Sequence, residues 1–148
     1  MTLYFFSVYL HVTAACAWIG SMFFFAAVVV PALRNRELAE HAPLVVRIVG
    51  KYYGRFGWVT LAVLLVTGCT NLWARGITWG QLSDGTFWNS GFGLALGHKL
   101  VFVAAVIVAT AAHHVVQGSR KRASSLGRVT LLLSLVIVYY AVSMVRGI

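Results

Sequence analysis

The sequence predicts an all-α integral membrane protein, a four-transmembrane-helix bundle with both termini outside. The first observation is the composition: 60% of the 148 residues are hydrophobic and 10% are charged, whereas about 25% of residues are charged in soluble domains. The second is that four segments reach the roughly 20 apolar residues that a helix needs to cross a hydrocarbon core of about 30 Å. These spans are expected at about 3–33, 56–74, 93–117 and 128–147, so a single membrane domain takes up residues 1–148.

The distribution of basic residues predicts the orientation. They gather in the first and third connections, at Arg34, Arg36, Arg47, Lys51, Arg55, Arg120, Lys121 and Arg122. Loops rich in Lys and Arg stay in the cytoplasm, so we expect the first and third loops inside and both termini outside. The formal charge of +9 is split among short loops next to the spans, and nucleic acid is therefore not expected as a partner.

Prolines and basic residues mark the first connection. Pro31 ends the first apolar run, and Pro43 stands where a new helix can begin, because the first turn of a helix leaves its amide hydrogens unused. Arg47, Lys51 and Arg55 follow at every fourth residue and predict one basic helix face. That face lies against anionic headgroups or against solvent, and both interpretations stay open. The chain is then expected to turn into the second span.

The second connection, residues 75–93, reads "RGITWGQLSDGTFWNSGFG". It is rich in Gly, Ser, Asn and Asp, which favour turns, and it carries several aromatic residues between them. We therefore expect an irregular outer loop whose aromatic side chains lie at the membrane interface.

Two histidines are expected at matched depth in the outer half of the membrane. His11 lies roughly 12 Å from the outer end of the first span and His98 roughly 8 Å from the outer end of the third, at about 1.5 Å per helical residue. Ionisable groups are costly in lipid and usually mark function. Neutral imidazoles on facing helices suit the axial positions of a b-type haem, so we expect haem between spans one and three. Lys99, the candidate catalytic residue, then meets a propionate or extends to the interface.

The inner half of the third span carries a second pair of histidines. His113 lies about 22 Å deeper than His98 and faces nearly the same side of the helix, whereas His114 is rotated by about 100°. The depth of His113 matches that of Met22 on the first span. One haem is the main prediction. A second haem at His113, with Met22 or His41 from the first connection as the candidate sixth ligand, is the alternative.

Two other functions fit the same residues. Cys69 and Met144 lie in the outer half with the two outer histidines, and such soft ligands suit Cu(I), which predicts copper transport or resistance. Both cysteines, Cys16 and Cys69, fall inside spans, so no disulfide framework is expected. Alternatively, the histidines only hydrogen-bond neighbouring helices, which predicts a non-catalytic subunit of a larger membrane complex. The apolar outward faces also permit a homodimer.

Three stretches resemble known membrane proteins: "LHVTAACAWIGSMFFFAAVVVPAL" in the first span, "RFGWVTLAVLLVTG" at the start of the second, and "GHKLVFVAAVIVATAAHH" in the third. They are similar to the CopD-like membrane domains and, more distantly, to HemJ-type protoporphyrinogen oxidases. The first resemblance implies a link to copper handling. The second implies a haem-b membrane oxidase in which His11 and Lys99 match the functional first-span histidine and third-span basic residue.

These observations together predict a small redox protein of a bacterial-type inner (cytoplasmic) membrane. It is expected to pass electrons, or to oxidise a porphyrin or a quinol, with a quinone or a porphyrin as its small-molecule partner. A copper protein and a non-catalytic subunit are the alternatives.

Overall fold

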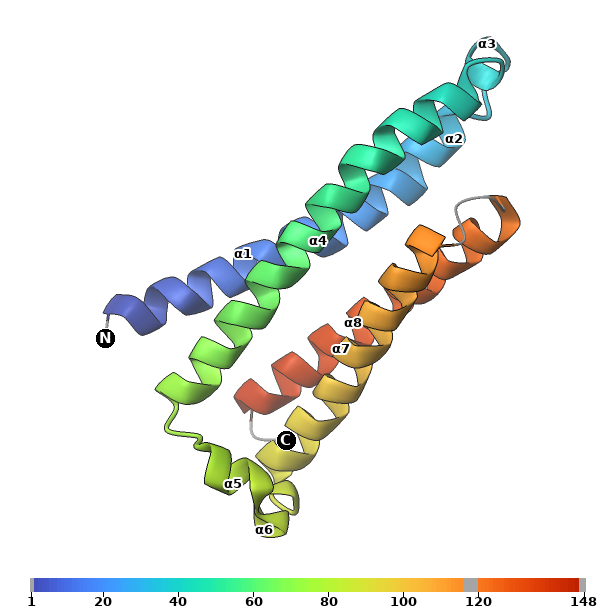
Figure 1. Cartoon of the computed structure of the whole chain (residues 1–148). Coiled ribbons are helices and arrows are strands. Elements are labelled where there is room, and N and C mark those ends of the chain that lie inside the picture. The colour runs from blue at the N-terminus through green and yellow to red at the C-terminus, as the bar shows by residue number, and fades with distance from the viewer. Residues whose placement is uncertain (1, 116–119, 147–148) are drawn as a thin grey trace. The chain divides into compact units, whose positions relative to one another are not determined.

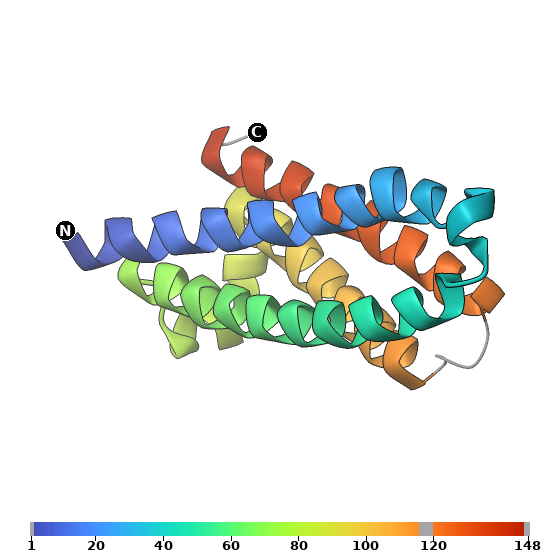
Figure 2. The ribbon, with the colours of Figure 1, turned by 90° about the horizontal axis from the view of Figure 1, so that it is seen from above.

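The computed structural model describes residues 2–115 and 120–146, and leaves the side chains of residues 2, 39, 113–115, 120–124 and 146 undescribed. Every regular element in this part of the chain is helical (Figure 1). The chain divides into two compact units, Met1–Gly76 and Ile77–Ile148. Each unit is built around a pair of long helices that run alongside each other (Figure 2).

The first unit pairs one nearly continuous apolar rod with a second long helix. The rod consists of α1 (Thr2–Phe24), a π-helical turn η1 (Phe25–Val29) and α2 (Val30–Ala32). In the π-helical turn the amide of Val30 donates to the carbonyl of Phe25, five residues back. Pro31 follows at once and has no amide hydrogen, so the regular α-helical ladder is interrupted here.

The second long helix of this unit is α4 (Ala42–Ala74), which follows the short α3 (Arg36–Ala39). The turn that we predicted before the second span is wrong, because α4 continues unbroken from Ala42. Pro43 lies in its first turn, where it costs no hydrogen bond, and no further proline interrupts the 33 residues of the helix. At about 1.5 Å per residue α4 is about 50 Å long, well beyond a 30 Å hydrocarbon core. It ends at Ala74, and Gly76 shortly after has a φ of +78°, which suits a residue without a Cβ.

The second unit begins with two short helices, α5 (Trp79–Ser83) and α6 (Gly85–Trp88). The irregular loop that we predicted here is therefore wrong for most of its length. Thr78 and Gln81 form a capping box at the start of α5, and Asp84 accepts the amide hydrogen of Thr86 at the start of α6. The spacing of Thr78 and Gln81 is itself a helix-start signal in the sequence.

The two long helices of the second unit are α7 (Gly91–Val115) and α8 (Arg120–Arg146). With the first unit they confirm the main prediction: in the described residues, four helices are long and apolar enough to cross a membrane. These candidate spans are Leu3–Ala32, Ala42–Ala74, Gly91–Ala112 and Ser125–Val145. The sides on which the termini lie, and the single domain over residues 1–148, stay predictions.

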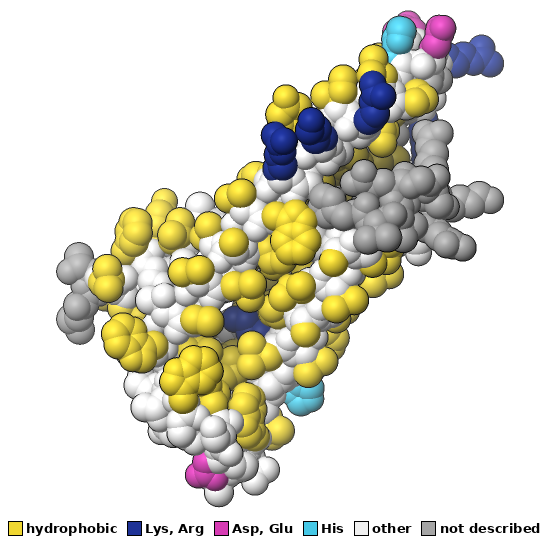
Figure 3. Space-filling view, viewed as in Figure 1, with side chains coloured by type: hydrophobic (Ala, Val, Ile, Leu, Met, Phe, Trp, Pro, Cys, Tyr) yellow, Lys and Arg dark blue, Asp and Glu magenta, His cyan; other side chains and the backbone are white. Residues whose placement is uncertain are grey.

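Burial in both units differs from that in a soluble protein, because small polar residues are buried beside the apolar ones while many large apolar residues are exposed. The buried polar residues are small and carry hydroxyl groups: Ser7, Thr60, Thr67, Thr130 and Ser134. Large apolar side chains cover the outside (Figure 3), and those exposed by 66% or more include Leu3, Phe5, Val66, Val101, Val108 and Val145. Helices that associate in lipid pack through small and polar residues and turn their apolar side chains to the acyl chains. The burial pattern therefore agrees with a bilayer as the surrounding solvent.

The carboxyl group of Asp84 gives the α6 cap a measurable pH dependence. The amide and the hydroxyl of Thr86 donate to it at 3.1 and 2.8 Å and hold the pKa of Asp84 below its ordinary value. Because the pKa is lower in the folded state, the cap contributes fully above the unfolded value and is lost as the pH falls through the folded value. Asp84 is the one aspartate in the chain, so ¹³C-labelled aspartate gives a single carboxyl signal in a titration followed by nuclear magnetic resonance.

We expect the midpoint of that titration to lie below the ordinary aspartate value. Thr86→Val removes the hydroxyl donor but leaves the amide donor, and it should move the midpoint part of the way back. A wild-type midpoint at or above the ordinary value would contradict the cap.

Candidate functional site

His11 lies on the face of α1 that packs against α4. Its side chain is half-buried, and its Nδ1 is 2.8 Å from the hydroxyl oxygen of Thr67 on α4. Ser7, one turn earlier on α1, donates to the backbone carbonyl of Thr67 at 3.5 Å. Ser7 and His11 of α1 therefore both contact Thr67 of α4. These two contacts fix the register of α1 against α4 near His11.

The hydroxyl of Thr67 determines which nitrogen of His11 carries the hydrogen. The Thr67 oxygen lies 2.6 Å from the carbonyl oxygen of Val63, and only the hydroxyl can donate in this bond. A hydroxyl has one hydrogen to give, so in its bond with His11 it accepts, and Nδ1 of His11 donates. In a neutral imidazole the lone pair then lies on Nε2. Nε2 is therefore the basic nitrogen of His11.

Small and aromatic residues complete the contact between α1 and α4 on the turns of α1 that follow His11. Trp18 is buried on the same face of α1 and lies over Gly57, where an added Cβ would be 3.4 Å from the indole ring. Ser21 donates to the backbone carbonyl of Trp18 at 2.7 Å and lies 3.5 Å from the hydroxyl of Tyr53. These contacts hold α1 and α4 in one register, which the bond between His11 and Thr67 requires.

Asn71 adds a polar group one turn beyond Thr67 on α4. Four residues separate the two, so they lie on neighbouring azimuths of the helix. The Oδ1 atom of Asn71 is buried and has no hydrogen-bond partner among the described residues. A buried acceptor of this kind suits a ligand that brings a hydrogen to donate.

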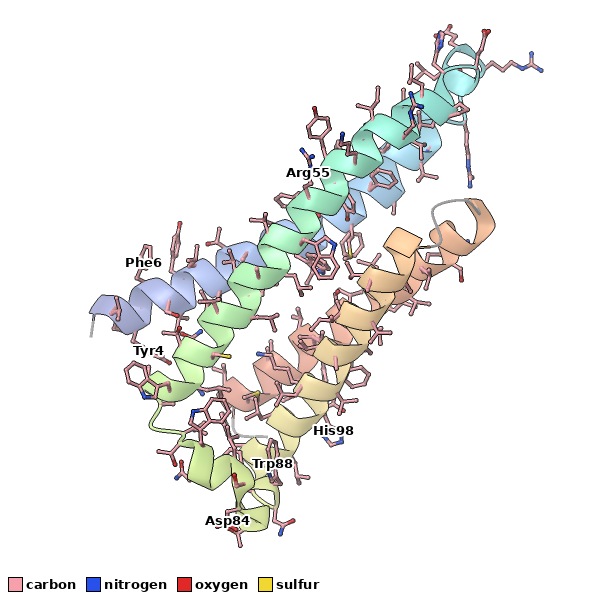
Figure 4. The ribbon with its side chains drawn as sticks, viewed as in Figure 1. Tyr4, Phe6, Arg55, Asp84, Trp88 and His98 are labelled. Carbon is pink, nitrogen blue, oxygen red and sulfur yellow. The ribbon has the colours of Figure 1, made fainter. Side chains whose placement is uncertain are left out.

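His98 lies on α7 and bonds within its own helix. Its Nδ1 is 2.8 Å from the carbonyl oxygen of Leu94, one turn back. A carbonyl oxygen carries no hydrogen, so Nδ1 of His98 must donate, and the lone pair of the neutral ring again lies on Nε2. The exposed imidazole projects from α7 (Figure 4) and stacks on the ring of Tyr140 from α8, with centroids 5.2 Å apart and planes 9° from parallel.

The short helices before α7 are fastened next to His98. Trp88 at the end of α6 donates from Nε1 to the carbonyl oxygen of Leu82 at 2.9 Å. Its ring covers Gly97, where an added Cβ would be 3.5 Å from the indole. Gly97 precedes His98 directly, and Lys99 follows it with a half-buried side chain. The α5–α6 segment is therefore held against α7 at Gly97, the residue before His98 in the chain.

The predicted ligands divide between the two units. The first unit holds His11, Met22 and Cys69, and the second holds His98, Lys99 and Met144. His113 and His114 belong to α7, but their side chains lie outside the described residues. The expected pairing of His11 with His98 stays a prediction, and so does the second haem at His113.

In the first unit, Cys69 and His11 lie on different faces of the contact between α1 and α4. Cys69 is two residues beyond Thr67 on α4, a rotation of about 200°, so its exposed thiol faces away from His11. Cys16 is also a free, exposed thiol. In the part of the chain that the structure describes, no three His, Cys, Asp or Glu side chains form a group that could hold a metal ion.

Sequence reasoning missed two partners of the histidines: Thr67, which bonds His11, and Tyr140, which stacks on His98. A signal for Thr67 was present, because Thr60, Thr67 and Asn71 recur at seven and four residues in an otherwise apolar helix and so mark one polar face. Tyr140 stands next to a second tyrosine, and nothing in the sequence distinguishes which of the two meets His98.

Comparison of the chain with protein-family models, with curated proteins and with solved structures finds no match. The resemblance to CopD-like and HemJ-type proteins therefore stays a prediction.

Proposed function

We propose that this chain is a small integral-membrane redox protein that binds b-type haem through Nε2 of His11 and Nε2 of His98. The observation that carries the proposal is the shared tautomer of the two rings. In each ring Nδ1 donates to an oxygen of the protein, Thr67 Oγ1 or Leu94 O. Histidine ligands of metals hold the second ring nitrogen in this way, because the bond fixes the ring and makes the ligating nitrogen more basic.

The surrounding residues have defined roles in this proposal. Thr67 and the Leu94 carbonyl hold the hydrogens on Nδ1, and Tyr140 sets the plane of the His98 ring. Lys99 supplies a cation for a propionate group of the porphyrin. A bound haem would supply one-electron transfer, while these side chains orient it and exclude water.

The redox partner in this proposal is a quinol or a porphyrin of the membrane. Both kinds of molecule carry O–H or N–H groups, and the buried Oδ1 of Asn71 is an acceptor for such a group. The apolar surfaces of the described helices give a lipid-soluble partner direct access from the bilayer.

The first test is an absorption spectrum of the detergent-purified protein, oxidised and then reduced with dithionite, with metal analysis of the same sample. We expect a Soret band and a sharp reduced α-band at a ratio near one haem per chain. A colourless protein that contains copper would replace the proposal with a copper function.

A non-catalytic role as a subunit of a larger membrane complex is the second candidate. The bond between His11 and Thr67 also favours this role, since a polar pair of this kind holds two membrane helices together at about 1 kcal/mol. A colourless, metal-free protein that purifies with another chain at fixed stoichiometry would select this role over haem binding.

A further inference from the structure

One face of α4 carries cations along its first half and apolar side chains along its second. At about 100° per residue the members of this face fall within an arc of about 120°. They are all exposed, and in chain order they are Leu44, Arg47, Ile48, Lys51, Arg55, Trp58, Val59, Ala62, Leu65, Val66, Cys69 and Trp73. We name this set the long face of α4.

The length of the long face matches the thickness of a bilayer. Arg55 and Trp73 are eighteen residues apart, or about 27 Å along the axis, close to the thickness of a hydrocarbon core. Trp side chains favour the membrane–water interface, and Trp73 is 76% exposed. With Trp73 at one border, Arg55 lies at the other. Lys51 and Arg47 then lie about 6 and 12 Å beyond the core, at the level of the headgroups and just outside them.

The three cations of the long face are not neutralised by any residue that the structure describes. Within the described residues, Arg47, Lys51 and Arg55 form no ion pair or hydrogen bond. Lys and Arg side chains gather along this part of α4 in Figure 3, and Figure 4 shows Arg55 projecting outward from the helix. Three unpaired cations in a row create a site for phosphate groups.

The apolar half of the face identifies the phosphate as that of a lipid. A soluble anion needs the three cations but gains nothing from the exposed Val59 and Val66 that continue the same face. A phospholipid uses both halves, because its phosphate lies at the border and its acyl chains run along the core. Tyr52, 66% exposed beside Lys51, adds a hydroxyl at the level of the glycerol.

We propose that the long face of α4 binds an anionic phospholipid, with the phosphate against Arg47, Lys51 and Arg55 and an acyl chain along Val59 and Val66. Each cation near an anionic membrane surface strengthens binding by roughly fivefold. The proposal concerns the lipid at one helix face and does not depend on haem binding.

The test is native mass spectrometry of the full-length protein titrated with equal amounts of phosphatidylglycerol and phosphatidylcholine. We expect wild-type protein to retain phosphatidylglycerol preferentially. The double variant Lys51→Gln/Arg55→Gln should lose about 25-fold in affinity for phosphatidylglycerol and keep its affinity for phosphatidylcholine. The matched control is Arg34→Gln/Arg36→Gln, which removes the same charge from exposed positions between α2 and α4.

The control and a competitor make the result decisive. Preference retained by Lys51→Gln/Arg55→Gln, or lost equally in Arg34→Gln/Arg36→Gln, would overturn the site in favour of a general effect of net charge. Displacement of phosphatidylglycerol by excess inorganic phosphate would overturn it in favour of a soluble anion. Circular dichroism of the variants verifies that the helices are intact, and Lys51→Arg/Arg55→Lys keeps both charges and should keep the preference.

Discussion

Replacement of His11 by alanine is expected to remove the haem absorption of the purified protein. The substitution deletes Nε2, the proposed axial ligand, and leaves the hydroxyl of Thr67 without its donor. His98→Ala should have the same effect, since a haem held by two histidines loses most of its affinity with either one. The measurement is the Soret absorbance per mole of chain, in protein that elutes as wild type in size-exclusion chromatography.

The controls distinguish a ligand from a helix contact. Cys16→Ala removes an exposed thiol from α1, the helix that carries His11, and should leave the spectrum unchanged. Thr67→Val keeps the shape of the side chain but removes the acceptor for Nδ1, and should weaken haem binding by roughly 10- to 100-fold without abolishing it. Thr67→Ser should restore binding. Full colour in His11→Ala or in His98→Ala would disprove this pair of ligands.

The sequence was sufficient to predict the four long helices, because twenty or so consecutive apolar residues have few other stable arrangements in lipid. It was insufficient for the extent of α4. A separate surface helix was suggested by Arg47, Lys51 and Arg55. No residue from Arg47 to Phe56 breaks a helix, however, so α4 continues from this stretch into the span. Charge pattern alone does not distinguish an amphipathic surface helix from the protruding end of a span.

The histidines were predictable as polar groups within apolar helices, but their partners were not. Whether His11 meets Thr67 or Asn71 depends on the register of α1 against α4, which is set by Trp18 lying over Gly57. Register is a property of the packed pair, and a single helix does not reveal it. The bond from His98 to Leu94, by contrast, is local to α7 and depends only on the rotamer of the histidine.

Gly93→Ala is expected to disrupt the start of α7 severely. A Cβ at this position would collide with the backbone carbonyl of Phe87, approaching its carbon to 2.9 Å and the hydroxyl of Ser90 to 3.0 Å. Backbone atoms cannot move aside as a flexible side chain can, so α6 must shift away from α7. Overpacking of this kind costs about 1–3 kcal/mol or more. Thermal unfolding of the purified protein in detergent, followed by circular dichroism, measures the loss.

Gly91→Ala and Gly127→Ala are the matched controls, because no atom lies within 4 Å of a Cβ added at either position. An alanine in the interior of a helix is favoured over glycine by up to about 1 kcal/mol, so the Gly127 variant should unfold at or above the wild-type temperature. The shift of α6 in Gly93→Ala would also draw Trp88 away from Gly97, the residue before His98. The disruption should therefore weaken haem binding as well as stability, and equal melting temperatures for Gly93→Ala and Gly91→Ala would show that α6 is not held against α7 in this way.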